Sequence, residues 1–238
     1  MTGFGAITAQ ELRITMRRGE SVLITFLIPL GLLVLLGATD LLDVEVDQFV
    51  PGLFALAIVS AAFVGLAVAT GFERKYMVLK RFGATPVRRL TLVLAKTTAI
   101  AVVEVLQIGM LWVVATVFFD WAPDVDWFAF GAAYVLGTVG PAGLAMLLAG
   151  RLRAEATLAL ANGLYFVFLG IGDVVVPLDR LPAAAAGVAQ VLPVAPLSAA
   201  FRAATGAGAA STTDWVVLLV WAVAAPLLAA RLFTWEER

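Results

Sequence analysis

A polar stripe crosses the otherwise apolar segment that ends at Phe119. Glu104 is the acidic residue at its centre, and Lys96 and Gln107 lie within about 80° of it on a helical wheel. A charge at the middle of a membrane helix costs roughly 2.5–3.5 kcal/mol, so such residues usually face a protein interior or a wet cavity. The stripe therefore either lines a translocation path or subunit interface, or holds the bundle together through a protonated Glu104 bonded to a neighbouring helix. Lys96 is also close enough to the helix end to reach the lipid headgroups.

Other chemistries are poorly served by the composition. The chain contains no cysteine and no histidine, which excludes thiolate chemistry and removes the commonest metal ligand and proton carrier at neutral pH. An intramembrane enzyme generally needs histidines, paired carboxylates or a serine–lysine pair at membrane depth. A secondary transporter usually buries several ionisable groups in broken helices. Both classes stay open as alternatives, but a single buried glutamate argues against each.

The composition identifies the solvent in which these residues work. Of 238 residues, 62% are apolar and 14% are charged, whereas a soluble domain is about 45–50% apolar and about 25% charged. Too few polar residues are present to cover a core in water, so lipid must face much of the surface. We expect an all-α polytopic membrane protein with one transmembrane domain over residues 1–238.

Six apolar runs are long enough to cross the membrane as helices. They cover residues 21–39, 48–72, 93–119, 127–150, 156–172 and 215–235. With both termini on the same side, all but two of the 16 lysines and arginines fall on that side; the exceptions are Arg180 and Arg202. The positive-inside rule then places both termini in the cytoplasm.

Residues 181–201 form a further uncharged run between the fifth and sixth spans. Pro193 and Pro196 interrupt it, remove backbone hydrogen-bond donors and break a helix in mid-segment. We expect two short helices that enter the outer leaflet and return. A seventh span, with the carboxyl terminus outside, is the alternative.

The first 20 residues are typical of a helix that lies on the cytoplasmic surface of the bilayer. Gln10, Arg13 and Arg17 share one helical face, and apolar residues occupy much of the remainder. Glu11 interrupts the apolar side. The alternative is a basic flank that only sets the topology.

Residues 73–83 predict a short amphipathic helix in the cytoplasmic loop between the second and third spans. One arc holds the apolar residues and the other the charged ones. The segment supplies the candidate residues Glu73, Arg74, Lys75, Tyr76, Leu79, Lys80, Arg81 and Phe82. Its alternative role is a charged connector held by lipid headgroups.

Two motifs in this order resemble the permeases of ABC-2 type transporters. The first comprises Glu73-Arg74, Leu79, Arg81, Ala84-Thr85-Pro86, Leu92, Lys96 and Gln107. The second is the proline-punctuated region of Pro177, Leu181-Pro182, Leu192-Pro193, Pro196-Leu197-Ser198 and Arg202. Many members have a glycine shortly after the Glu-Arg pair, where this chain has Tyr76-Met77-Val78.

The resemblance implies a membrane subunit of an exporter for drugs, antibiotics or lipid-like substrates. Such permeases dock on two copies of a separate ABC ATPase through the amino-terminal interfacial helix and the cytoplasmic coupling helix, here residues 1–20 and 73–83. The resemblance also implies a second permease chain, identical or related, in the plasma (inner) membrane. ATP and Mg²⁺ would bind the ATPase and no cofactor this chain, which has no Gly-x-x-x-x-Gly-Lys-Ser/Thr phosphate loop. Membrane lipids are expected partners and nucleic acids are not.

Overall fold

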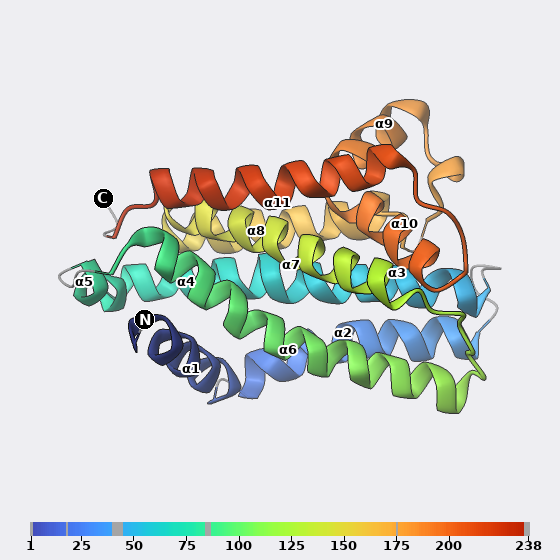
Figure 1. Cartoon of the computed structure of the whole chain (residues 1–238), viewed down its shortest axis with the longest axis horizontal. Coiled ribbons are helices and arrows are strands. Elements are labelled where there is room, and N and C mark those ends of the chain that lie inside the picture. Colours follow the sequence, from blue (N-terminus) through green and yellow to red (C-terminus); the bar gives the residue numbers. More distant parts are fainter. Residues whose placement is uncertain (1, 18, 40–44, 84–86, 175, 236–238) are drawn as a thin grey trace.

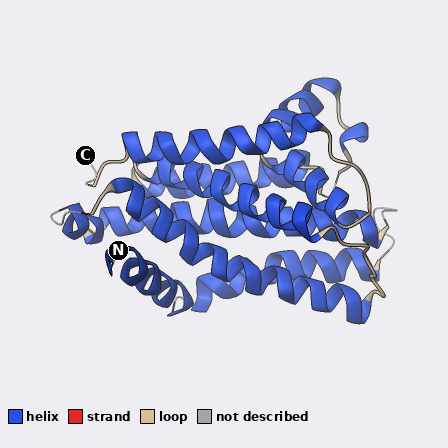
Figure 2. Cartoon of the chain, viewed as in Figure 1, coloured by secondary structure: helices blue, strands red, loops and turns tan. Residues whose placement is uncertain are grey.

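The computed structural model describes residues 2–17, 19–39, 45–83, 87–174 and 176–235. Within these ranges the chain is helical and contains no strand (Figure 2). The helices are α1 Thr2–Arg17, α2 Gly19–Ala38, α3 Val46–Ile58, η1 Val59–Gly65, α4 Leu66–Lys75, α5 Val78–Gly83, α6 Arg89–Phe118, α7 Trp127–Ala149, α8 Ala154–Ile171, η2 Leu178–Arg180, α9 Ala183–Val191, α10 Val194–Ala204 and α11 Thr212–Leu232. The predicted all-α class is confirmed.

Among the described residues, five helices are long and apolar enough to cross a membrane, and there are up to six if the bent pair α9 and α10 counts as one span. The five are Val46–Lys75, Arg89–Phe118, Trp127–Ala149, Ala154–Ile171 and Thr212–Leu232. They coincide with the second to sixth predicted spans. The first predicted span corresponds to the 20-residue helix α2, whose apolar part among the residues searched is Phe26–Ala38.

The second span runs through the centre of the bundle as one continuous helix, formed by α3, η1 and α4. In its most apolar window 78% of the residues are buried inside the chain. Its middle section, η1, is a π-helix that touches α2, α6, α7 and α8. π-helical segments are rare and accumulate at functional positions. One largely buried helix with an irregular middle section therefore connects the two ends of the bundle.

Small residues on α7 let α11 pack closely along it. A β-carbon on Gly140 would lie 3.1 Å from Cβ of Trp221, and one on Gly143 would overlap the backbone at Pro226. In a membrane, where lipid is as apolar as the protein interior, close backbone approach of this kind is a main source of helix association.

The segment predicted to break does break. α9 and α10 are separated by Leu192 and Pro193 and bend by 77°. α10 packs on α3 and α7, where Phe54 meets Phe201 and Phe130 with ring centroids 5.9 Å apart. The helix before the bend, α9, stays largely exposed.

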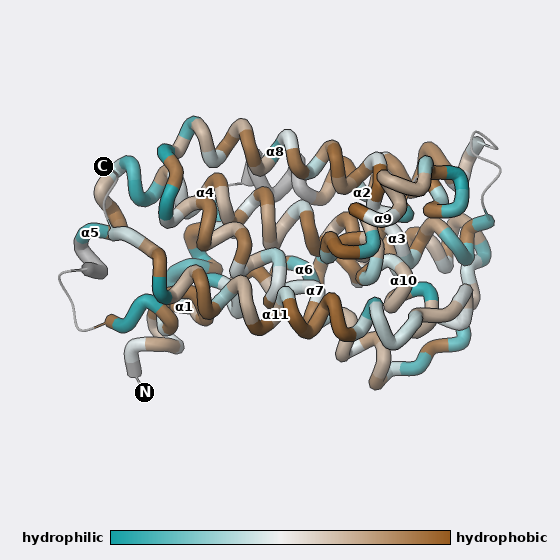
Figure 3. The backbone as a smooth tube through the Cα atoms, turned by 90° about the horizontal axis from the view of Figure 1, so that it is seen from above, coloured by the Kyte–Doolittle hydropathy of each residue, from teal (hydrophilic) through white to brown (hydrophobic). Residues whose placement is uncertain are grey.

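The two ends of the bundle differ in what they carry. α1, α5 and the end of α11 lie at one end, and α9 and α10 lie at the other (Figure 1). Hydrophobic residues dominate the middle of the long helices, and hydrophilic residues gather at both ends (Figure 3). The chain is a multi-pass membrane protein whose first helix, α1, and the end of whose last helix, α11, lie at the same end of the bundle.

Candidate functional site

The amino-terminal helix α1 turns its predicted polar face away from the bundle. Gln10, Arg13 and Arg17 are exposed, whereas Ile7 and Glu11 are buried. These two buried residues are one helical turn apart and therefore share a face, and α1 packs on α6. Glu11 is not among the site residues that we predicted from the sequence. Its position on the apolar side of the helix is the feature of the sequence that could have indicated its burial.

Glu11 belongs to a buried ion cluster that joins three helices. Lys96 of α6 donates from Nζ to Oε2 of Glu11 in α1 and to Oε2 of Glu73 in α4, at 2.6 Å in each case. Lys96 is 1% exposed, and the residues Glu11 and Glu73 are each 7% exposed. Buried charges are tolerated only when they are paired and hydrogen-bonded. The cluster therefore fixes α1 and the end of α4 against α6.

The residues that follow Glu73 attach α4 to the other side of the bundle. The Arg74 side chain is buried and donates a hydrogen bond to the carbonyl oxygen of Ala149, at the end of α7. Lys75 pairs with Glu155 in the first turn of α8. Glu73 and Arg74, predicted on an exposed polar arc, are thus buried by contacts with α6 and α7.

The single helix expected over residues 73–83 is divided in two, which corrects that prediction. α4 extends to Lys75, its last turn is closed by a hydrogen bond of 3.1 Å from Met77 N to Arg74 O, and α5 starts at Val78. Met77 has a φ of 58°, in the left-handed region that ends a right-handed helix. The periodicity of the segment could not reveal this turn because both halves are helical.

The turn at residues 76–77 and the start of α5 form an exposed, mainly apolar surface that also carries a lysine. Tyr76 is 69% exposed, Met77 64% and Val78 41%, and Lys80 is exposed beside them. Leu79 is instead fully buried and attaches α5 to the bundle. The side chains of Arg81 and Phe82 lie outside the described part of the structure.

The predicted polar stripe on α6 is separated into two environments. Lys96 lies in the ion cluster, about 12 Å along the helix from Glu104 at 1.5 Å per residue. Glu104 is fully buried and accepts a hydrogen bond of 2.6 Å from Thr138 Oγ1 on α7. Gln107 is fully buried one turn further on. All three side chains are enclosed by this one chain.

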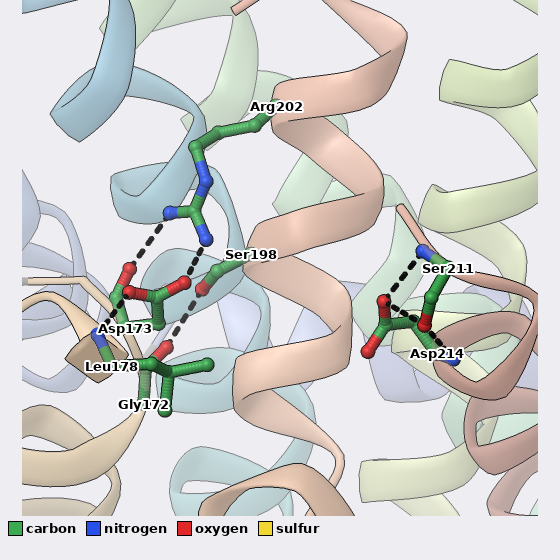
Figure 4. A network of polar contacts seen from close by, with 7 residues as sticks. All are labelled: Gly172, Asp173, Leu178, Ser198, Arg202, Ser211 and Asp214. Atoms are coloured by element: carbon green, nitrogen blue, oxygen red, sulfur yellow. Dashed lines mark hydrogen bonds and ion pairs between the residues drawn. The ribbon is translucent and has the colours of Figure 1, made fainter. Parts of the chain in front are cut away.

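A second polar network holds the opposite end (Figure 4). Arg202 of α10 pairs with Asp173, just after α8, and donates 2.8 Å to its carbonyl oxygen. Ser198 Oγ donates 2.9 Å to Gly172 O. Burial raises the pKa of Asp173 above its ordinary value, even though Arg202 acts in the opposite direction. Near this network, Ser211 and Asp214 form a capping box that starts α11.

The geometry is that of a membrane bundle in which α1 and α5 carry exposed side chains at one end. Comparison with known proteins assigns its family. The model of the ABC-2 type transporter family matches residues 2–205, a range that includes α1, α5, both polar networks and the bent pair. No curated protein matches the chain significantly. The match confirms the resemblance seen in the two motifs and supports a permease subunit that partners an ABC ATPase. The chain belongs to the ABC-2 type transporter family.

Proposed function

We propose that the chain is the permease of an ATP-driven exporter and moves a hydrophobic or amphipathic substrate, such as a drug, an antibiotic or a lipid, out of the cell. In this proposal two permease chains, identical or related, assemble with two ATPase subunits in the plasma membrane, and both termini lie in the cytoplasm. ATP and Mg²⁺ bind the ATPases. The family match supports the class of transporter, and the small number of polar residues on α6 favours an apolar cargo.

The observation that carries the proposal is the abrupt change in burial at the end of α4. Glu73 and Arg74 are buried, whereas Tyr76 and Met77, two and three residues further on from Arg74, are 69% and 64% exposed. An external protein that grips the exposed turn therefore acts directly on side chains fixed inside the bundle. α1 lies at the same end, with Gln10, Arg13 and Arg17 exposed.

Movement of the exposed turn has two routes into the membrane. Glu73 leads to α6 through Lys96, and Arg74 leads to α7 through the Ala149 carbonyl. α4 itself continues through η1 into α3, which contacts α10 at the far end. Closure of the ATPases would thus reach the bent pair α9 and α10, which we propose shapes the exit.

The translocation path would form when α6 moves. Lys96, Glu104 and Gln107 are enclosed in the described conformation. Glu104 and Gln107 reach a path between two permeases only after α6 separates from α7, while Lys96 stays in the ion cluster with α1 and the end of α4. A polar stripe this sparse favours an uncharged cargo.

Two cysteine variants test the proposal, because the natural chain has no cysteine. Tyr76→Cys places a thiol on the proposed docking turn, and Phe128→Cys places one at the opposite end, where Phe128 is 88% exposed. We expect a membrane-impermeant maleimide to label Phe128→Cys in intact cells and Tyr76→Cys only in opened ones.

The same pair tests docking. With a thiol-to-amine crosslinker, Tyr76→Cys is expected to link to the co-purified ATPase, and Phe128→Cys is not. Labelling of Tyr76→Cys from outside the cell, or equal crosslinking of the two variants, contradicts the proposed docking end.

A further inference from the structure

We infer that Lys96 is a positioning residue that locks the two proposed docking elements, α1 and the end of α4, into one rigid body with α6. The inference rests on the proposed function for its role in transport, whereas the mechanical joint itself is a property of this chain alone. The sequence places Lys96 near a helix end, where a lysine usually extends to the headgroups. The structure places its ammonium between two carboxylates instead.

The joint, meaning the ion cluster of Lys96, Glu11 and Glu73, is shared by α1 and α4. One ammonium serves two carboxylates at the same distance, 2.6 Å, and each carboxylate comes from a different helix. Lys96 is 1% exposed, so in the described conformation its ammonium is stabilised by the two carboxylates and not by water. A charge left buried without its partners is strongly unfavourable. α1 and α4 therefore stay with α6, and through it with each other.

α1 depends on this joint more than α4 does. α4 is also held by Arg74 at α7 and by its continuity with η1. Among the described side chains of α1, Ile7 and Glu11 are the buried ones. An amphipathic helix without a fixed contact lies in the headgroup region and takes its orientation from the lipid. Through the ion pair of Glu11 with Lys96, α1 is attached to the protein, and its position does not depend on the lipid alone.

Two substitutions of the same kind distinguish the loss of the contact between α1 and α6 from a general loss of stability. Glu11→Gln and Glu73→Gln each remove one carboxylate charge of equal burial and equal distance from Lys96. Each leaves Lys96 with one carboxylate, so the chain is expected to fold in both cases. Only Glu11→Gln weakens the contact between α1 and α6.

The experiment is a spin-label distance measurement on the purified full chain in lipid nanodiscs. Labels at Gln10→Cys on α1 and Val113→Cys on α6 occupy exposed positions. The parent chain is expected to give a single narrow distribution. Glu11→Gln and Lys96→Met are expected to lose it, while Glu73→Gln and the control Lys75→Met, which removes an exposed cation, keep it. A narrow distribution in both Glu11→Gln and Lys96→Met overturns the inference; so does its loss in Lys75→Met.

A second measurement examines the role in transport. A label at Met77→Cys paired with Val113→Cys follows the docking turn, and a non-hydrolysable ATP analogue is added to the complex with the co-purified ATPase. In the parent complex both distances are expected to stay unchanged when the analogue binds, because α1, the end of α4 and α6 move together. In Glu11→Gln the distance from Gln10→Cys to Val113→Cys is expected to change, and the distance from Met77→Cys to Val113→Cys is expected to stay the same. If the Gln10–Val113 distance changes in the parent complex, or stays unchanged in Glu11→Gln, Lys96 does not couple the two elements. If no ATPase co-purifies with the parent chain, the proposed function fails, and the nanodisc measurement still decides the joint.

Discussion

Arg74 donates a hydrogen bond to the carbonyl oxygen of Ala149, which joins the end of α4 to the end of α7. The last carbonyls of a helix have no partner within it and lie at the negative end of its dipole. The buried guanidinium of Arg74 donates to such a carbonyl and also places a positive charge at the negative end of α7. The contact joins residues 75 positions apart, so it sets how the exposed turn at Tyr76 is mounted on the bundle.

Arg74→Met is therefore expected to lower the free energy of unfolding by about 1.5–3 kcal/mol, the usual range for a hydrogen bond to a charged group. Unfolding by titration with a denaturing detergent measures this change. Arg13→Met, which removes an exposed arginine from α1, should change the free energy by no more than about 0.5 kcal/mol. Equal losses in the two variants would show that Arg74 contributes only charge.

Two glycine-to-alanine substitutions should differ in their effect on stability. At Gly143 a β-carbon overlaps the backbone at Pro226 in α11, whereas at Gly163 on α8 no heavy atom lies within 4 Å of it. Gly143→Ala should cost about 1–3 kcal/mol, because α7 and α11 must move apart. Gly163→Ala should be neutral or stabilise by up to about 1 kcal/mol through helix propensity. Thermal unfolding in detergent gives both signs, and destabilisation by Gly163→Ala would mean that another chain covers this face of α8.

Glu104 and Thr138 offer a test of the two interpretations of the buried glutamate. Glu104→Gln keeps an oxygen that accepts from Thr138, while Glu104→Leu removes it. We expect Glu104→Leu to be less stable than Glu104→Gln by about 1 kcal/mol, and Thr138→Val to add little in the Leu background. If Glu104 also lines the path, Glu104→Gln should alter transport at unchanged stability. Additive losses in the double variant would refute the pairing.

The outer network predicts a pH dependence. Burial raises the pKa of Asp173 above the ordinary value of 3.8. A group whose folded-state pKa is raised stabilises the fold below its unfolded pKa, and this contribution is lost as the pH rises through the folded pKa. The thermal midpoint of the parent chain should therefore rise on acidification through this window by more than that of Asp173→Asn. Parallel pH profiles of the two proteins would contradict the assignment.

The sequence predicts the long helices well because each corresponds to a continuous run of apolar residues. Runs such as 127–150 and 156–172 differ from α7 and α8 by at most two residues at either end. The break before α10 followed from Pro193. The turn at Met77 was missed, since a left-handed residue between two helical stretches leaves no trace in hydrophobic periodicity.

The family of this chain and its membrane helices followed from the sequence alone, because apolar runs, prolines and short motifs are properties of neighbouring residues. The tertiary structure alone decided the partners of Lys96, which come from positions 85 and 23 residues away, and the burial of Glu73 and Arg74. Such pairings depend on which faces of separate helices meet. Helical periodicity fixes what each face contains but not which face it will touch.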